Sequence, residues 1–397
     1  MTIISAGQLI SSAWFECKRA LGIFVRQSPT QPWSLIPPLP GEQSDFIAKW
    51  QSKAPRLPIA LLERQYLAPH LEQFSVTLGC SPEAEAKAIA VGQFRLANNQ
   101  FINLGFPVDW NRNQQESAGM HWAKASADVD STASAINEAS QFNWAYPLVR
   151  AWIVSGDDAH AEAFWNLLED WMEKNPPNLG PQWVRDEAIA RRILAVTFAT
   201  QAFRFHSATT DHRLIQAARF ITVSAEHLHL TLSKVQACSP IFGLQSAAAL
   251  LTAGALWSSL PAADSWRSAG LESLIIEGKK LCRHDGYASP SEISTYAQIL
   301  EIYTWTEIIL RSENERESLP ESLQVNIRAL AMKVGQAPAI IAPGAPLFFL
   351  SGCASGDVRP AVATALILFT GVYFETGPWD ESTLLLVGPM CTSAVAL

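Results

Sequence analysis

The sequence has little charge and no cluster of basic residues. Only 17% of its 397 residues are Asp, Glu, Lys or Arg, the net charge is −8 at pH 7, and 48% of the residues are hydrophobic. This composition excludes a disordered chain and a coiled coil. A protein that holds the phosphate backbone of DNA or RNA needs a basic stripe, so we expect no nucleic-acid partner.

Cysteine pairs and long apolar runs are also missing. The six cysteines include no Cys-x-x-Cys pair, which argues against a zinc site or a disulfide framework and predicts free, buried thiols. The longest apolar stretch, Pro360 to Phe374, is shorter than the about 20 residues that a membrane-spanning helix needs, so it predicts a buried helix. The N-terminus has no charged region before its apolar stretch, so we expect no signal peptide and a cytoplasmic protein.

Motifs for metals and common cofactors are absent as well. The sequence contains no His-Glu-x-x-His, no Gly-x-Ser-x-Gly and no glycine-rich phosphate loop. His227 and His229 are two residues apart on a predicted helix, so they face different directions and do not form a metal pair. We therefore expect neither a metal nor a cofactor.

The chain does contain a series of helical segments with apolar residues every three or four positions. Helices are predicted over residues 161–171, 184–205, 211–232, 244–259, 264–282, 291–311 and 320–335. Ser81-Pro82 and Ser289-Pro290-Ser291-Glu292 have the residues of helix N-caps. Short turns join the helices, which favours antiparallel hairpins that stack as a solenoid or close into a toroid.

Two regions differ in composition. Residues 1–80 contain eight of the 24 prolines and are predicted to form an N-terminal wrapping segment. Residues 81–397 are predicted to form the helical domain. Fourteen tryptophans stand out; most should be core residues, although their flat faces also suit stacking on sugars.

Several polar and aromatic residues are candidates for a binding site. Trp110 ends a short predicted strand and is either a packed loop residue or the floor of a sugar groove. One amphipathic helix is predicted to carry a polar set that either lines a cleft or is solvated: Glu138, Gln141, Asn143, Trp144, Tyr146 and Arg150.

Two further helices carry candidates. Trp183 precedes a helix with Glu187 and Arg191 at i and i+4, where the alternative to a binding role is a helical ion pair. His284 lies in a turn before the helix that carries Tyr296. Tyr296 is either a general acid/base, if a nearby cation lowers its pKa, or a core tyrosine.

One set of residues has an order and spacing that resemble the helical N-terminal part of the heparinase II/III family, itself similar to alginate lyase-like polysaccharide lyases. The set consists of Asp109-Trp110, Gly156-Asp157, Trp171, Asn175-Pro176-Pro177, Trp183, Glu187 and Arg191. The resemblance as a whole covers about residues 90–390.

The resemblance implies an all-α fold, an incomplete (α/α) toroid of antiparallel helical hairpins. In the family a β-sandwich domain follows the toroid, and we expect this chain to lack it. The implied activity is β-elimination on a uronic-acid polysaccharide, which makes an acidic polysaccharide or oligosaccharide the expected partner. A base removes the proton α to the carboxyl group, and neutralising donors stabilise the enolate-like intermediate.

The resemblance also assigns roles to residues. It implies that Tyr296 is catalytic and that the substrate-binding residues are Trp110, Asn143, Trp144, Trp183, Glu187, Arg191 and His284. If the family geometry holds, Asn143, Trp183, Arg191 and Tyr296 converge on one concave face.

Several positions depart from the family pattern, among them Ser291, Ile293 and Ala297, where the family has a Glu, a Ser and a His. Ile241 and Gly243 stand where the family has the Asn and the His of an Asn-x-His element. Isoleucine and glycine can neither neutralise a carboxylate nor move a proton, so the catalytic site is expected to be degraded or altered. The alternatives are a non-catalytic glycan-binding or scaffold relative and a truncated gene product; the sequence gives no signal for the oligomeric state.

Overall fold

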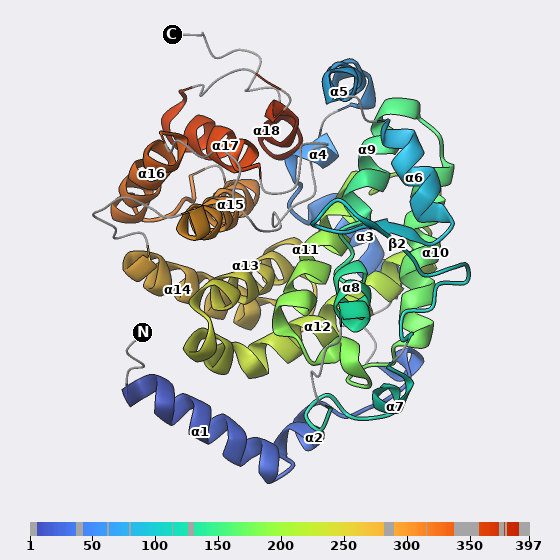
Figure 1. Ribbon diagram of the computed structural model, residues 1–397, viewed down its shortest axis with the longest axis vertical. Coiled ribbons are helices and arrows are strands. Elements are labelled where there is room, and N and C mark those ends of the chain that lie inside the picture. The colour runs from blue at the N-terminus through green and yellow to red at the C-terminus, as the bar shows by residue number, and fades with distance from the viewer. Residues whose placement is uncertain are drawn as a thin grey trace.

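The computed structural model describes residues 6–36, 43–61, 63–78, 81–112, 114–125, 131–281, 290–314, 316–336, 357–372, 377 and 379–388. Most of these residues are helical (Figure 1). The first half contains α1 (Ala6–Ala20), α2 (Ile23–Gln27), η1 (Trp33–Leu35), α3 (Gln43–Lys53), α4 (Pro58–Leu61), α5 (Arg64–Leu78), α6 (Pro82–Ala90), β1 (Gln93–Arg95), β2 (Phe101–Asn103), α7 (Gln115–Ala118), α8 (Ser131–Ala139) and α9 (Ala145–Ser155).

The second half continues with helices alone. They are α10 (Ala159–Lys174), η2 (Pro181–Trp183), α11 (Asp186–Ala202), α12 (Asp211–Cys238), α13 (Pro240–Leu256), α14 (Ala263–Leu281), α15 (Pro290–Glu313), α16 (Glu321–Gly335), α17 (Arg359–Thr370) and α18 (Asp380–Val387). The two strands pair antiparallel, with Phe94 opposite Ile102. The predicted helices therefore form, with ends shifted by a few residues.

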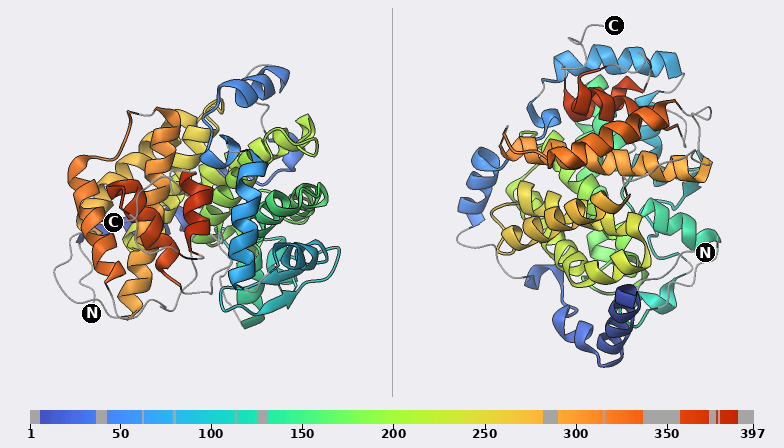
Figure 2. Two further views of the ribbon diagram at one scale, coloured as in Figure 1. Left: turned by 90° about the horizontal axis from the view of Figure 1, so that it is seen from above. Right: turned by 90° about the vertical axis from the view of Figure 1, so that its left-hand side faces the viewer.

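The helices are arranged as a curved row of hairpins (Figures 1 and 2). An inner layer runs from α9 to α11, α13, α15 and α17, each in contact with the next. An outer layer pairs with it through the contacts α9–α10, α11–α12, α13–α14, α15–α16 and α17–α18. The last helix, α18, contacts α4 and α5, and α5 packs on α9. This confirms the all-α toroid of antiparallel hairpins.

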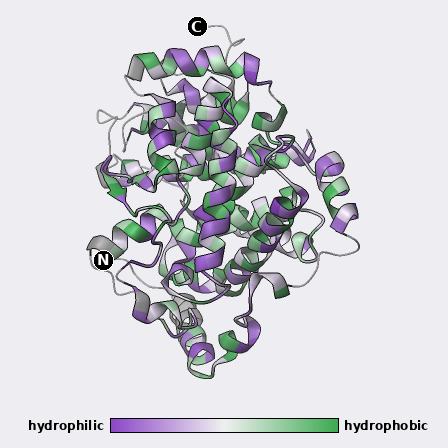
Figure 3. Cartoon of the chain, turned by 90° about the vertical axis from the view of Figure 1, so that its right-hand side faces the viewer, coloured by the Kyte–Doolittle hydropathy of each residue, from purple (hydrophilic) through white to green (hydrophobic). Residues whose placement is uncertain are grey.

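The local sequence explains where helices begin and which of their faces are buried. The Ser81 hydroxyl accepts the N–H of Ala84, 3.3 Å away, with Pro82 in the first helical position, as the sequence predicts for this N-cap. The predicted cap at Ser289 lies outside the described residues. Helix α13 is apolar on every side because it is enclosed by α11, α12, α14 and α15. In Figure 3, most of the helices carry both hydrophilic and hydrophobic residues along their length.

The N-terminal residues pack against both layers of the hairpins. Helices α1 and α3 contact α12, and α4 contacts α11. The indole N–H of Trp50 donates to the carbonyl of Leu256, 3.1 Å away, and that of Trp33 donates to Met172, 2.7 Å away. The division of the chain at residue 80 remains a prediction.

Most tryptophans belong to the core, and α17 is the buried helix expected of the long apolar run. Among the described residues, no helix has both the length and the apolar composition needed to cross a bilayer. The prediction of buried thiols is wrong for Cys17 and Cys238, which are free and exposed. Cys238 is the last residue of α12, where the helix ends at the surface.

A single helix over residues 138–150 is also wrong. Helix α8 ends at Ala139, a turn follows in which Phe142 has a φ of 65°, and α9 begins at Ala145. Pro147 explains the break, because its ring would clash with the carbonyl of residue 143 in a continuous helix, whereas proline fits the first turn of α9. Glu138 and Arg150 therefore do not share one helix face.

Candidate functional site

Three inner helices send ionisable side chains toward one another. Tyr146 comes from α9, Arg191 from α11 and Glu301 from α15. Glu301 is the charged group that acts most strongly on Arg191, followed by Tyr146. Gln245 of α13 and Gln298 of α15 extend the group, with 3.4 Å between Gln245 Nε2 and Gln298 Oε1. We call these five residues the axial cluster.

Burial dominates the electrostatics of the axial cluster. It lowers the pKa of the Arg191 guanidinium, an effect that the carboxylate of Glu301 opposes. Burial also raises the pKa of Tyr146 well above its usual range; Arg191 opposes this shift and Glu301 adds to it. At neutral pH Tyr146 is therefore a protonated phenol, able to donate a hydrogen bond and unable to remove a proton.

Two more carboxylates act on Arg191 from other directions. Glu138, at the end of α8, accepts the backbone N–H of Ala97. Burial raises the pKa of Glu138, which Ala97 and Arg191 oppose. Glu187 is 2.7 Å from Arg185 Nε, so its ion pair is with Arg185 rather than the i+4 partner considered from sequence. The surroundings of Arg191 thus contain three carboxylates.

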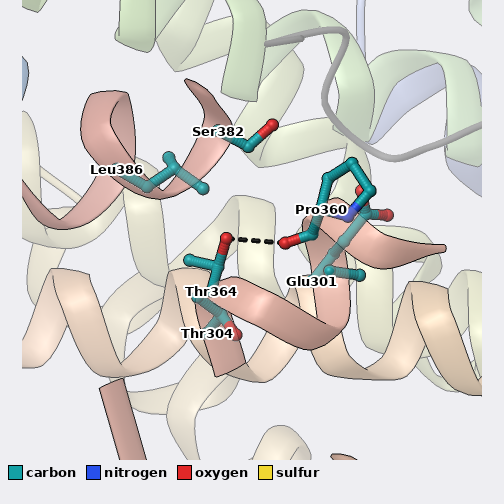
Figure 4. Close-up of a pocket in the computed structure, with 7 residues that line it drawn as sticks. Glu301, Thr304, Pro360, Thr364, Ser382 and Leu386 are labelled. Carbon is teal, nitrogen blue, oxygen red and sulfur yellow. Dashed lines mark hydrogen bonds between the residues drawn. The ribbon is translucent and has the colours of Figure 1, made fainter. Parts of the chain in front are cut away.

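A small pocket adjoins the axial cluster (Figure 4). Its lining comes from α15, α17 and α18 and consists of Glu301, Thr304, Pro360, Ala361, Thr364, Ser382 and Leu386. It has room for about one water molecule. The Thr364 hydroxyl donates to the Pro360 carbonyl, 2.6 Å away, whereas the buried Thr304 hydroxyl has no hydrogen-bond partner among the described atoms. Glu301 connects this pocket to Arg191.

Tyr296 lies on another side of α15. It is five residues from Glu301, about 140° around the helix axis, and seven residues from Tyr303, whose hydroxyl donates to Leu274 in the outer helix α14. Lys333 of α16 lies 5.7 Å from the centre of the Tyr296 ring. Burial, with Glu292, raises the pKa of Tyr296, so the lowered pKa that a catalytic base needs is not present. This structure places Tyr296 on the face of α15 that meets the outer layer.

The candidate tryptophans are core residues. Trp110 is fully buried, donates to Asp170 over 2.7 Å and packs near Phe94 and Trp144, so it has no open face for a sugar. Trp144 and Trp183 are buried as well. Of the two alternatives for Trp110, a packed loop residue or the floor of a sugar groove, the structure shows a packed residue.

Asn143 and His284 complete the predicted set; Asp186, the sequence neighbour of Glu187, is not among the predicted site residues. Asn143 is buried in the turn before α9, and its Oδ1 has no partner among the described atoms. Asp186 faces away from Glu187: it accepts from the Thr231 hydroxyl at 2.5 Å and lies 3.4 Å from His227 Nε2. His229 is exposed while His227 is buried, as expected of residues that face different ways. His284 lies outside the described residues.

Ile241 and Gly243, which stand at the Asn and His positions of the family's Asn-x-His element, lie at the start of α13. Ile241 is half-buried and packs against the core. Gly243 is buried, and a Cβ atom there would lie 2.9 Å from the Cα of Gln236 in α12. A histidine at 243 therefore requires the backbone of the α12–α13 turn to move.

In the described part of the chain, no group of three His, Cys, Asp or Glu side chains could hold a metal ion. The site residues that sequence reasoning missed are Gln245, Gln298, Glu301 and Thr304. A signal was present for one of them, since Gln245 is the single amide in the mostly apolar helix α13. Glu301 had none, because an isolated glutamate in a helix usually faces solvent.

The model for the heparinase II/III N-terminus matches residues 64–337. A heparin-sulfate lyase of Bacteroides thetaiotaomicron is 20% identical over 267 residues, which are 66% of this chain and 37% of that protein. The chain thus spans less than half the length of this curated relative.

Solved structures show the same fold. The crystal structure of heparinase III has a TM-score of 0.55 at 16% identity, over 76% of this chain and 45% of that one. The heparan sulfate lyase of Pedobacter heparinus has a TM-score of 0.52 at 16% identity, over 76% and 44% of the two chains. At this identity the likeness establishes the fold, and the chain spans about half of each structure.

Proposed function

This chain belongs to the heparinase II/III family by its N-terminal region, and from that premise we propose that its toroid binds an acidic polysaccharide and has little or no elimination activity of its own. The relatives are named as lyases of heparin or heparan sulfate, which supports a polyanionic glycan as the ligand class. The proposal thus combines the family's ligand with a degraded site.

The observation that carries the proposal is the start of α13. Elimination needs a donor that neutralises the uronate carboxyl and a group that moves the α proton. Ile241 offers neither, and Gly243 lies too close to Gln236 for any side chain without a backbone shift. Losing one transition-state donor lowers a rate about 10²- to 10³-fold, and losing a proton-transfer group lowers it about 10²- to 10⁴-fold.

By the family resemblance Tyr296 is the residue through which activity would remain, although it lies on the face of α15 that meets the outer layer. Its raised pKa leaves it able to protonate a leaving oxygen but not to take the α proton at neutral pH. An elimination that depends on Tyr296 alone therefore lacks its base. This makes glycan binding the better-supported function.

The test combines binding and turnover on the full chain. Heparan sulfate, heparin and alginate are titrated by calorimetry, and the unsaturated uronate product is followed by its ultraviolet absorbance. We expect binding of at least one polymer with little or no product, unchanged in Tyr296→Phe. The matched control is Tyr303→Phe on the same helix. Turnover at ordinary enzyme rates that disappears only in Tyr296→Phe would overturn the proposal, as would no binding of any polymer.

A further inference from the structure

Glu301 lies between two groups of polar side chains. On the side of the inner helices α9 and α11, Glu301 interacts with Tyr146 and Arg191. On the side of α17 and α18, it lines the small pocket with Thr304 and Ser382. Figure 4 shows Glu301 and Thr304 on α15 below Pro360 of α17. The pocket therefore combines a carboxylate with hydroxyl groups.

Two polar atoms, one in the pocket on α15 and one on the neighbouring helix α13, are deeply buried and unsatisfied among the described residues. The Thr304 side chain is 1% exposed and its Oγ1 has no partner. Gln245 is completely buried, and its Oε1 has none either, although its Nε2 reaches Gln298. Because leaving a buried polar atom unpaired is unfavourable, such atoms mark places where a further polar group belongs.

The hydrogen-bonding inventory decides which group that is. A carboxylate and an amide oxygen only accept, and a hydroxyl can accept as well as donate. A ligand hydroxyl can donate its one hydrogen to any of these acceptors, and an ammonium group can donate to as many as three. A uronate or sulfate group brings negative charge next to Glu301 and has no hydrogen to donate, so it is disfavoured here. The space, about one water molecule, admits one such group and excludes a whole sugar ring.

We propose that Glu301 and Thr304 form a subsite that takes a single hydrogen-bond-donating group of a sugar, a hydroxymethyl or an amino group, and selects a neutral or amino sugar at this end of a bound glycan. The inference rests on the proposed function in one respect, namely that the toroid binds a glycan. The acidic sugars of such a glycan would then lie elsewhere along the chain.

The experiment measures the affinity of the full chain for three tetrasaccharides: a chitosan oligomer, its N-acetylated chitin counterpart and a heparin oligomer. Glu301→Gln should weaken the chitosan or chitin oligomer about tenfold, because a charge-assisted hydrogen bond becomes a neutral one, and should not weaken the heparin oligomer. A loss confined to chitosan identifies the amino group, and an equal loss for both identifies a hydroxyl. The control Glu313→Gln is on the same helix, where its carboxylate pairs with Arg267 at 2.9 Å.

A second pair of variants separates binding from folding. Thr304→Val removes the unsatisfied hydroxyl, so it should leave the melting temperature unchanged or higher while weakening the same oligomer several-fold. Thr306 does not line the pocket, and its hydroxyl donates to the carbonyl of Ile302, 2.8 Å away. Thr306→Val should therefore leave binding unchanged.

The outcomes distinguish the two proposals. If the protein binds acidic polymers and Glu301→Gln alters no affinity, the pocket holds only a water and the inference fails while the proposed function stands. If only the chitosan or chitin oligomer binds, and loses affinity in Glu301→Gln, the subsite stands and the acidic ligand class fails. If no glycan binds at all, both are wrong.

Discussion

At the scale of single residues, the core contains charges that are held by hydrogen bonds and rings. The Arg192 guanidinium is fully buried and donates to the carbonyls of Ser140 and Gln182, with the ring of Trp171 4.8 Å away. Burial lowers its pKa to about 9. Asp186 is the matching buried anion. Burial alone would raise the pKa of Asp186, but its interactions with His227 and Thr231 outweigh burial and lower it. Such partners, rather than burial, decide which polar residues the core tolerates.

Asp186→Asn tests this balance. The folded pKa lies below the unfolded one, so the folded protein binds fewer protons and the stabilisation is present above about pH 4 and lost as the pH falls through the folded value. We expect the free energy of unfolding to fall by about 2 kcal/mol at pH 7. The difference from the wild type should shrink below about pH 4, as measured by urea denaturation at both pH values.

The control for this variant is Asp211→Asn. Asp211 is exposed and, like Asp186, is the first residue of a helix, so both variants lose a favourable helix-dipole interaction of about 0.3–1 kcal/mol. An equal loss in the two variants would contradict a special role for the His227 and Thr231 contacts.

At the scale of helices and turns, most of the fold was predictable because it depends on local chemistry. The period of apolar residues and the Ser81-Pro82 cap identify helices directly. The break between α8 and α9 was missed, although Pro147 carried its signal. The spacing between helices was not predictable, because it depends on which residue of one helix meets which residue of another. Gly270 of α14 is such a case, since a Cβ atom there would lie 2.5 Å from the carbonyl oxygen of Ala247 in α13.

Gly270→Ala should therefore destabilise the protein, although alanine is the better helix former by about 1 kcal/mol. The new methyl group meets backbone atoms of Ala247 and Leu251, which cannot rotate away. We expect a net loss of about 1–3 kcal/mol in the free energy of unfolding. Ser268→Ala, an exposed position on the same helix, should change it by less than about 0.5 kcal/mol. A stabilised Gly270→Ala protein would show that α13 and α14 are less tightly packed than described.

At the scale of the whole molecule, the curved row of helices is joined across its ends by a buried ion pair. Arg150 of α9 donates to Glu381 of α18 and also to the hydroxyl of Ser75 in α5, 3.0 Å away. Both charged side chains are almost fully buried. The sequence could not predict this pair, because its members are 231 positions apart and any glutamate is an equal candidate. The sequence points to Arg191 and Tyr146 of the axial cluster but not to Glu301, because these residues meet only once the row of helices is assembled.

Replacing one member of the ion pair should cost far more than replacing both. Arg150→Met or Glu381→Leu leaves an uncompensated buried charge, and we expect each to lower the free energy of unfolding by about 3–5 kcal/mol. The double variant Arg150→Met/Glu381→Leu should recover most of that loss, because no buried charge remains. Guanidinium denaturation of the four proteins gives the comparison. Additive losses in the double variant would mean that the two charges do not depend on each other.

The central claim, that this toroid holds a glycan without cleaving it, is tested most directly by a single-turnover measurement. Protein in excess over heparan sulfate, heparin or alginate is incubated until the polymer is bound, and the absorbance of the unsaturated uronate is then followed for many hours. Excess protein removes slow product release as an explanation for a missing signal. We predict that the bound polymer keeps its length and that the absorbance does not rise. Product formed in an amount comparable to the bound chains, and abolished by Tyr296→Phe, would contradict the account.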